Sequence, residues 1–191
     1  MTSEQVIQVF RESGALLEGH FIYASGRHGR QFLQAARVTQ YPKYVEQLGA
    51  ALAAPFQEER IDLVIGPATG GIVLAYEAAR HLGCRAAYTE KDDVSGMALK
   101  RGFALKPGER VLVVEDIATT GGSVRKSVEH LRARGAFVAG VSVLIDRSGG
   151  KVGFDCPYYP LARLDMDSWP PDALPDDLHS TPPMDPDDII L

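Results

Sequence analysis

The sequence contains few cysteines, and the two that are present, Cys84 and Cys156, lie far apart. Their spacing matches no zinc-binding motif, and they cannot form the disulfide framework of a small secreted protein. Hydrophobic residues make up 45% of the 191 residues, so a core can form without crosslinks. We therefore expect reduced thiols and a cytoplasmic protein.

The sequence also has no long apolar run and no surplus of basic residues. No stretch reaches the ~18 apolar residues that a membrane span needs, and we do not expect the polar start of the chain to be a signal peptide. The 20 lysines and arginines are outnumbered by 25 aspartates and glutamates, which gives a formal net charge of -5. Nucleic-acid-binding proteins usually carry a basic surplus, so we expect neither nucleic acid nor a membrane as a partner.

Strand-like and helix-like segments alternate through the middle of the chain. The expected strands are short runs rich in β-branched and other apolar residues, at 61–65, 85–89, 111–115 and 137–145. The expected helices lie at 42–54, 72–82 and 122–134, and the last two end next to a glycine suited to a C-cap. Alternation of this kind predicts an α/β fold with a central parallel sheet flanked by helices.

Two regions fall outside this alternation. Residues 13–38 carry several glycines among aromatic and basic residues, and we expect them to form a small antiparallel hood added to the main sheet. Residues 166–191 contain six prolines and an acidic surplus, a composition that favours an extended tail over a packed helix. The expected organisation is a single domain over 1–165, with its core at about 42–147, followed by this tail.

The stretch with the most chemical information is 111–123, Val-Leu-Val-Val-Glu-Asp-Ile-Ala-Thr-Thr-Gly-Gly-Ser. Its four apolar residues predict a buried strand, which delivers Glu115 and Asp116 to the sheet edge where ligands bind in open α/β folds. The hydroxyls and glycines that follow open a helix, whose free N–H groups attract an anion. Carboxylates beside a phosphate cradle suit a phosphorylated sugar, since they can accept hydrogen bonds from its hydroxyls.

Other interpretations explain less of this stretch. A solvated acidic turn followed by a Thr or Ser N-cap would account for the acidic pair or for Thr120-Gly121 alone, but not for the whole string. The stretch also lacks the Gly-Lys-[Ser/Thr] of a Walker A loop and the glycine spacing of a dinucleotide-binding fingerprint.

Residues 115–123 resemble the phosphoribosyl pyrophosphate signature of the phosphoribosyltransferases. The resemblance implies that Glu115 and Asp116 hold the ribose hydroxyls while 119–123 wrap the 5-phosphate. Residues 66–71, Gly-Pro-Ala-Thr-Gly-Gly, are similar to the family's pyrophosphate loop, although Gly70 stands where some members carry a lysine. The residues expected to bind phosphoribosyl pyrophosphate are Glu115, Asp116, Ala118, Thr119, Thr120, Gly121, Gly122, Ser123, Thr69 and Gly70.

Two further segments resemble the orotate phosphoribosyltransferases, and all the matches together span roughly 13–165. Residues 14–27 followed by Phe32 are similar to that branch's N-terminal hood, and Asp146-Arg147 is similar to its Asp-Arg pair. Taken alone, Arg147 would be a surface arginine in a turn; the resemblance implies that it faces the pyrimidine carboxylate, which a planar guanidinium holds through paired hydrogen bonds. The residues expected to bind orotate are Ser25, Arg27, Phe32, Thr119 and Arg147.

Residues 88–103 occupy the position of the family's mobile catalytic loop. Lys91 matches its first basic residue, whereas Lys100 and Arg101 match a basic pair of one branch but fit a solvated charged hairpin equally well. Because the family's loop reaches the neighbouring subunit's site, the resemblance implies a homodimer with shared active sites. The expected catalytic residues are Asp116, Lys91 and Glu115.

The resemblance implies transfer of the phosphoribosyl group from phosphoribosyl pyrophosphate to orotate, giving orotidine 5′-monophosphate and pyrophosphate in UMP biosynthesis. Mg²⁺ is the expected cofactor, held mainly through the substrate rather than by direct protein ligands. His20 and His28 have no third ligand at a suitable spacing, so we expect them to be packing or surface histidines. The alternatives are a purine phosphoribosyltransferase, a regulator that senses phosphoribosyl pyrophosphate, and a structural α/β domain.

Overall fold

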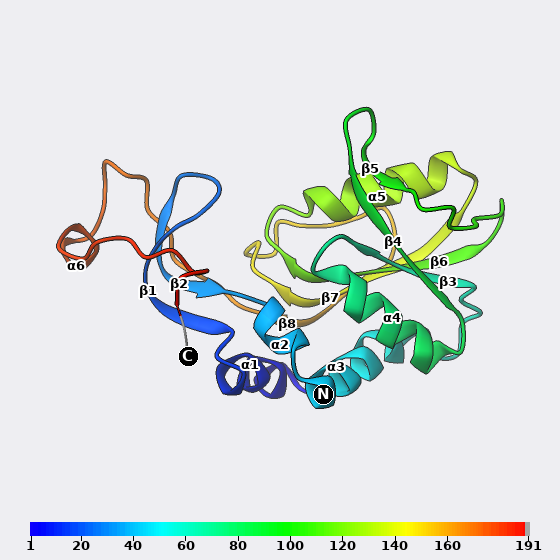
Figure 1. Ribbon diagram of the computed structural model, residues 1–191, viewed down its shortest axis with the longest axis horizontal. Coiled ribbons are helices and arrows are strands. Elements are labelled where there is room, and N and C mark those ends of the chain that lie inside the picture. The colour runs from blue at the N-terminus through cyan, green and yellow to red at the C-terminus, as the bar shows by residue number, and fades with distance from the viewer. Residues whose placement is uncertain (190–191) are drawn as a thin grey trace.

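A computed structural model describes residues 1–189. Its centre is a six-stranded sheet in the order β5-β4-β3-β6-β7-β8 (Figure 1). Neighbouring strands are parallel except β4 and β5, which form an antiparallel hairpin. The strands are β3 (Leu63–Pro67), β4 (Arg85–Asp92), β5 (Gly96–Leu99), β6 (Arg110–Ala118), β7 (Phe137–Asp146) and β8 (Tyr158–Arg163).

Helices cover both faces of this sheet. One face packs against α1 (Ser3–Glu12), α3 (Pro42–Ala53) and α4 (Gly71–Leu82), and the other packs against α5 (Gly122–Ala133). The shorter helical segments are α2 (Ala36–Thr39), η1 (Ala54–Phe56) and α6 (Asp176–His179). Within residues 1–189, no helix is long and apolar enough to cross a bilayer.

The central strand β6 is buried on both faces of the sheet, which explains its continuous apolar run. Leu112 and Val114 belong to the core shared with α1, α3 and α4, whereas Val111 and Val113 belong to the core shared with α5. All four are fully buried, so each stabilises the fold by about 1.5–3 kcal/mol. This packing holds the C-terminal end of the strand, where the acidic pair lies, in a fixed place.

The predicted α/β fold is confirmed, and every predicted strand and helix is present with bounds shifted by a few residues. The sequence pattern does not indicate β5 or β8. β5 is short and lies within the charged segment that follows β4. β8 is an edge strand with mixed exposure that contains Pro160, and proline is tolerated in a sheet mainly at such edges. Neither strand carries the apolar run of a buried parallel strand.

Residues 13–38 contain the predicted antiparallel pair, β1 (Leu16–Ile22) and β2 (His28–Leu33), but as a separate two-stranded sheet. The expectation that this hood extends the main sheet is therefore wrong. At the β8 edge, Ser3 of α1 donates a hydrogen bond to the Leu161 carbonyl at 3.1 Å. The hood sits to one side of the core (Figure 1).

The tail runs alongside the hood (Figure 1). Most of it is extended, and α6 is its one short helix within the described residues. Trp169 pairs with His28 in an antiparallel bridge, with N–H to carbonyl distances of 2.8 and 2.9 Å. The tail is thus hydrogen-bonded to β2 of the hood.

Candidate active site

The loop between β6 and α5 forms a shallow cradle. Glu115 and residues 117–124 line a hollow of about 210 Å³. Gly121 has a φ of 71°, a left-handed conformation that favours glycine, and a Cβ at this position would lie 3.0 Å from Val152. Among the described residues, no side chain caps the first turn of α5. Its N–H groups are therefore available to an anion such as a phosphate.

Glu115 and Asp116 form a pair of interacting carboxylates at the end of β6. Glu115 is buried; its Oε1 accepts a hydrogen bond from the Asp116 N–H at 3.1 Å, and Asp116 Oδ1 accepts one from the Ile117 N–H at 2.6 Å. Burial, followed by the charge of Asp116, raises the pKa of Glu115 to about 9. Burial also raises the pKa of Asp116 above its usual range. A positive charge in this site would favour the ionised form of both residues.

A second loop, residues 66–71 between β3 and α4, meets the first loop at Asp116. The loop is compact, because a Cβ on Gly66 would lie 2.0 Å from the carbonyl oxygen of Gly71. A Cβ on Gly70 would likewise lie 2.0 Å from Asp116 Oδ2. Some phosphoribosyltransferases carry a lysine in place of Gly70, and such a side chain would require Asp116 to move here. The two loops together bring Gly70 and the adjacent Thr69 to the acidic pair.

Arg147 extends the site toward the hood. It directly follows β7, and its N–H donates to the Ala118 carbonyl at 2.9 Å. Its guanidinium lies over the ring of Tyr23 in the hood, with 4.6 Å between Cζ and the ring centroid. Its Nε is buried and has no hydrogen-bond partner within residues 1–189. An unpaired buried donor costs free energy, so this geometry suits an anionic ligand that supplies an acceptor.

The match to known proteins covers most of the chain. A family model for the phosphoribosyl transferase domain matches residues 34–169. The orotate phosphoribosyltransferase of Thermus thermophilus is 45% identical over 170 residues, which span 89% of this chain and 93% of that protein. The chain belongs to the orotate phosphoribosyltransferase family.

Two more members of the family agree with this assignment. The orotate phosphoribosyltransferase of Heliobacterium modesticaldum is 46% identical over 188 residues, which span 97% of this chain and 98% of that protein. The crystal structure of orotate phosphoribosyltransferase from Aeropyrum pernix is 29% identical and has a TM-score of 0.67, covering 83% of this chain and 93% of that chain. The likeness thus includes the hood as well as the core.

The segment expected to be the family's catalytic loop is the β4–β5 hairpin, which projects from the sheet (Figure 1). Lys91 lies near the end of β4 and is exposed. Asp92 shapes the turn, because its Oδ2 accepts hydrogen bonds from the N–H groups of Val94 and Ser95 at 3.2 and 2.9 Å. The hydrogen bonds from Ser95, followed by that from Lys100, hold the pKa of Asp92 well below its usual range. Lys91 therefore lies on an ordered β-hairpin, next to a turn that is stabilised by hydrogen bonds.

Lys100 and Arg101 are engaged within the same hairpin. Lys100 Nζ lies 3.1 Å from Asp92 Oδ1 and donates to the Lys91 carbonyl at 2.9 Å. Arg101 Nε lies 3.1 Å from Glu90 Oε2. These contacts favour the solvated-hairpin interpretation of both residues. By contrast, the Lys91 ammonium has no ion-pair partner among residues 1–189.

Three of the residues predicted to bind orotate make their contacts within the hood and tail. Arg27 donates from Nε to Ser168 Oγ at 2.8 Å and from Nη2 to the Ser168 carbonyl. Ser25 Oγ accepts a hydrogen bond from the Arg27 N–H at 3.4 Å. The ring of Phe32 packs against that of Phe21, with 5.6 Å between centroids. The other two predicted orotate residues lie in or beside the phosphate loop.

Sequence reasoning missed Tyr23 and Ser168. Tyr23 lies within the matched hood segment, but nothing in its spacing distinguishes it from neighbouring residues. Its hydroxyl donates to the Gln31 carbonyl at 2.7 Å, and burial raises its pKa. Ser168 belongs to a region whose composition predicts a solvated tail, and it contacts Arg27 from 141 positions away. No local pattern could have indicated that contact.

His20 and His28 contact each other between hood and tail. His20 Nε2 lies 2.6 Å from His28 Nδ1, and His20 Nδ1 lies 2.5 Å from the Thr181 carbonyl. Since a carbonyl can only accept, His20 Nδ1 carries a proton in this arrangement. Within residues 1–189, no group of three or more His, Cys, Asp or Glu side chains is arranged to hold a metal ion. The two histidines are packing residues that join the hood to the tail.

Proposed function

We propose that the chain transfers the phosphoribosyl group of phosphoribosyl pyrophosphate to orotate, which yields orotidine 5′-monophosphate and pyrophosphate for pyrimidine biosynthesis. The observation that carries this proposal is the buried Nε of Arg147, which lies beside the phosphate loop and has no hydrogen-bond partner within residues 1–189. A guanidinium in this place offers paired hydrogen bonds to a carboxylate on the base. The names of the relatives described above support the same substrates.

The proposed binding mode assigns one part of the substrates to each part of the site. The loop after β6 wraps the 5-phosphate, and the acidic pair accepts hydrogen bonds from the ribose hydroxyls. Backbone N–H groups of 66–71 hold the diphosphate at the start of α4. The residues proposed to bind phosphoribosyl pyrophosphate are Glu115, Asp116, Ala118, Thr119, Thr120, Gly121, Gly122, Ser123, Thr69 and Gly70, and those for orotate are Ser25, Arg27, Phe32, Thr119 and Arg147.

In the reaction, the bond between ribose C1 and the diphosphate oxygen breaks while orotate N1 forms a bond to C1. Positive charge develops on the ribose ring, and negative charge accumulates on the departing diphosphate. Asp116 and Glu115 stabilise the developing positive charge, which in turn favours their ionised forms. Lys91 and the N–H groups of 66–71 stabilise the departing diphosphate.

The acidic pair fits a divalent cation bound together with the substrate. Burial raises the pKa of both carboxyl groups, so each gains from a nearby positive charge. When Mg²⁺ is bound, it neutralises charge on the diphosphate and orients its oxygens. We propose that the ion is held mainly through the substrate.

We further propose a homodimer in which the β4–β5 hairpin of one subunit reaches the active site of the other. The hairpin projects away from its own sheet, and Val94 at its tip is 96% exposed (Figure 1). An apolar residue on a projecting arm is suited to contact with a second surface. Lys91 would then act in the partner's site.

A turnover assay with orotate, uracil, adenine and hypoxanthine in parallel tests the proposed function. Uracil is the matched control for orotate, because it has the same ring without the carboxylate. We expect turnover with orotate and at least about 100-fold lower kcat/KM with uracil, because a site built for a polar group discriminates strongly against an analogue that lacks it. Comparable turnover with uracil or with either purine would overturn the proposal.

A further inference from the structure

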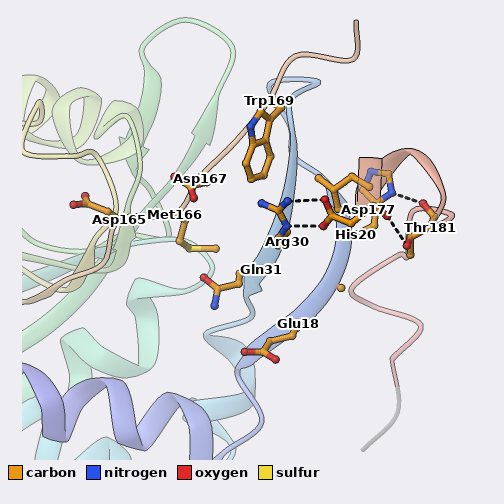
Figure 2. A pocket seen from close by; sticks show the side chains of 12 residues that line it. Glu18, His20, Arg30, Gln31, Asp165, Met166, Asp167, Trp169, Asp177 and Thr181 are labelled. Carbon is orange, nitrogen blue, oxygen red and sulfur yellow. Dashed lines mark hydrogen bonds and ion pairs between the residues drawn. The ribbon is translucent and has the colours of Figure 1, made fainter. Parts of the chain in front are cut away.

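The tail is fastened to the hood along much of its length (Figure 2). The bridge between Trp169 and His28 joins the tail to β2 through two backbone hydrogen bonds. Farther along, Arg30 donates two hydrogen bonds to Asp177, at 2.7 and 2.6 Å, while its guanidinium lies 4.5 Å from the Trp169 ring centroid. The hood is therefore completed by residues from the other end of the chain.

The space between hood and tail is not closely packed. A cavity of about 550 Å³ lies there, and Arg30, Trp169 and Asp177 are among the side chains that line it (Figure 2). The contact between hood and tail thus depends on separate polar anchors rather than on a continuous apolar core. Loss of one anchor should alter the hood locally without unfolding the protein.

One anchor reaches the turn that carries the predicted orotate residues. Ser168 accepts two hydrogen bonds from the Arg27 guanidinium, one at its Oγ and one at its carbonyl. The turn is closed by a hydrogen bond from the Tyr23 N–H to the Arg27 carbonyl at 2.8 Å. Tyr23 in turn lies against the guanidinium of Arg147. A continuous set of contacts therefore joins the tail to Arg147.

We propose that the tail is part of the base-binding half of the active site, with Ser168 positioning the 23–27 turn against Arg147. This inference rests on the proposed transfer to orotate. A two-stranded antiparallel sheet is only marginally stable alone, and within residues 1–189 the hood forms a sheet separate from the main one. The Trp169 bridge adds two backbone hydrogen bonds to β2, and Ser168 fixes the direction of the Arg27 side chain. Ser168 is a positioning residue, because it would act through its contacts with Arg27.

The test compares Ser168→Ala with two matched variants. Ser168→Ala removes the Oγ acceptor, and we expect the KM for orotate to rise about fivefold while the KM for phosphoribosyl pyrophosphate and kcat stay within about twofold. Ser168→Thr keeps the hydroxyl and should restore the orotate KM. Ser180→Ala is the control, since Ser180 lies in the same tail and its hydroxyl donates to the carbonyls of Asp176 and Asp177. It should behave as wild type.

A double-mutant cycle separates positioning from general loosening of the hood. If Ser168 acts through Arg27, then Ser168→Ala should change nothing further when Arg27 is already alanine. Trp169 is the single tryptophan of the chain, so an unchanged emission maximum in Ser168→Ala would show that the tail is still docked.

Three results would overturn the inference: an unchanged orotate KM in Ser168→Ala, an equal rise in the KM of both substrates, or additivity with Arg27→Ala. The wild-type assay with orotate distinguishes this failure from that of the proposed function. If the wild type uses orotate and Ser168→Ala matches it, only the role of the tail is wrong. If the wild type does not use orotate, the proposed function itself is wrong.

Discussion

The phosphate loop and the hood lie on two sides of one candidate site, and they are built in different ways. The phosphate loop consists of consecutive residues between a largely buried strand and a helix. The hood combines two strands from near the start of the chain with tail residues that lie 141 positions later. The packed core holds the residues proposed to bind the phosphoribosyl group in fixed positions, whereas the hood, held by a few polar contacts, can shift around the base. We therefore expect substitutions in the core to affect chemistry, and those in the hood to affect recognition of the base.

Asp116→Asn should have the largest effect. The substitution is nearly isosteric but removes a negative charge beside the developing cation. It should raise the activation barrier by about 2.7–4 kcal/mol, which lowers kcat roughly 100- to 1000-fold. The thermal melting temperature should not fall, because the variant removes a carboxyl group whose pKa is raised by burial. Asp155→Asn, at a fully solvated side chain, is the control for steady-state kinetics. Near-normal turnover would remove Asp116 from the site.

Arg147→Ala tests the junction between the two regions. It should weaken orotate binding by about 10- to 100-fold, since hydrogen bonds to charged groups contribute about 1.5–3 kcal/mol each. Binding of phosphoribosyl pyrophosphate should change by less than about threefold. The control is Arg163→Ala on the neighbouring strand, where the guanidinium is 66% exposed and 3.8 Å from Asp146. Equal losses for both substrates, measured by titration, would indicate a disturbed sheet edge instead.

Lys91→Ala tests whether the projecting hairpin serves the chemical step. We expect kcat to fall about tenfold with little change in substrate affinity, because the interaction strengthens only as the diphosphate departs. Mixing this variant with Asp116→Asn subunits should restore activity, since each hybrid dimer contains one site with both residues intact. If subunit exchange is demonstrated and the mixture gains no activity, Lys91 does not act in the neighbouring site.

The smallest effect should come from Arg30→Ala in the hood. The ion pair with Asp177 is largely exposed, so solvent screens it and little stability is lost. We expect an orotate KM about twofold above wild type and an unchanged KM for phosphoribosyl pyrophosphate. Arg80→Ala removes a half-exposed guanidinium, paired with Glu46 and Glu77, from the core helix α4 and should leave both constants unchanged. Identical kinetics for the two variants would contradict the expectation that the hood, and not helix α4, affects recognition of orotate.

The same contrast decides what the sequence could predict. The run 111–114 and the residues after it specify a strand, a turn and a helix locally, so the fold and the cradle follow from periodicity and residue type. The contact between Arg27 and Ser168 depends on the path of a proline-rich tail, and no local preference determines that path. The same holds for Tyr23, whose partner Arg147 comes from the far end of β7. Lys100 and Arg101 show a third case, in which neighbouring acids in a hairpin engage charges that a motif match would assign to substrate.

The acidic pair allows the candidate active site to bind a proton at neutral pH. With a pKa of about 9 in place of 4.5, Glu115 keeps its proton at pH 7 while the site is empty, whereas the unfolded chain would have lost it. Its contribution to stability is therefore complete below pH 4.5 and is lost as the pH rises through about 9. A divalent cation bound together with the substrate would favour the ionised carboxylate and so displace this proton. Calorimetry in buffers of different ionisation enthalpy should then detect release of about one proton on binding of magnesium phosphoribosyl pyrophosphate, and none in Glu115→Gln.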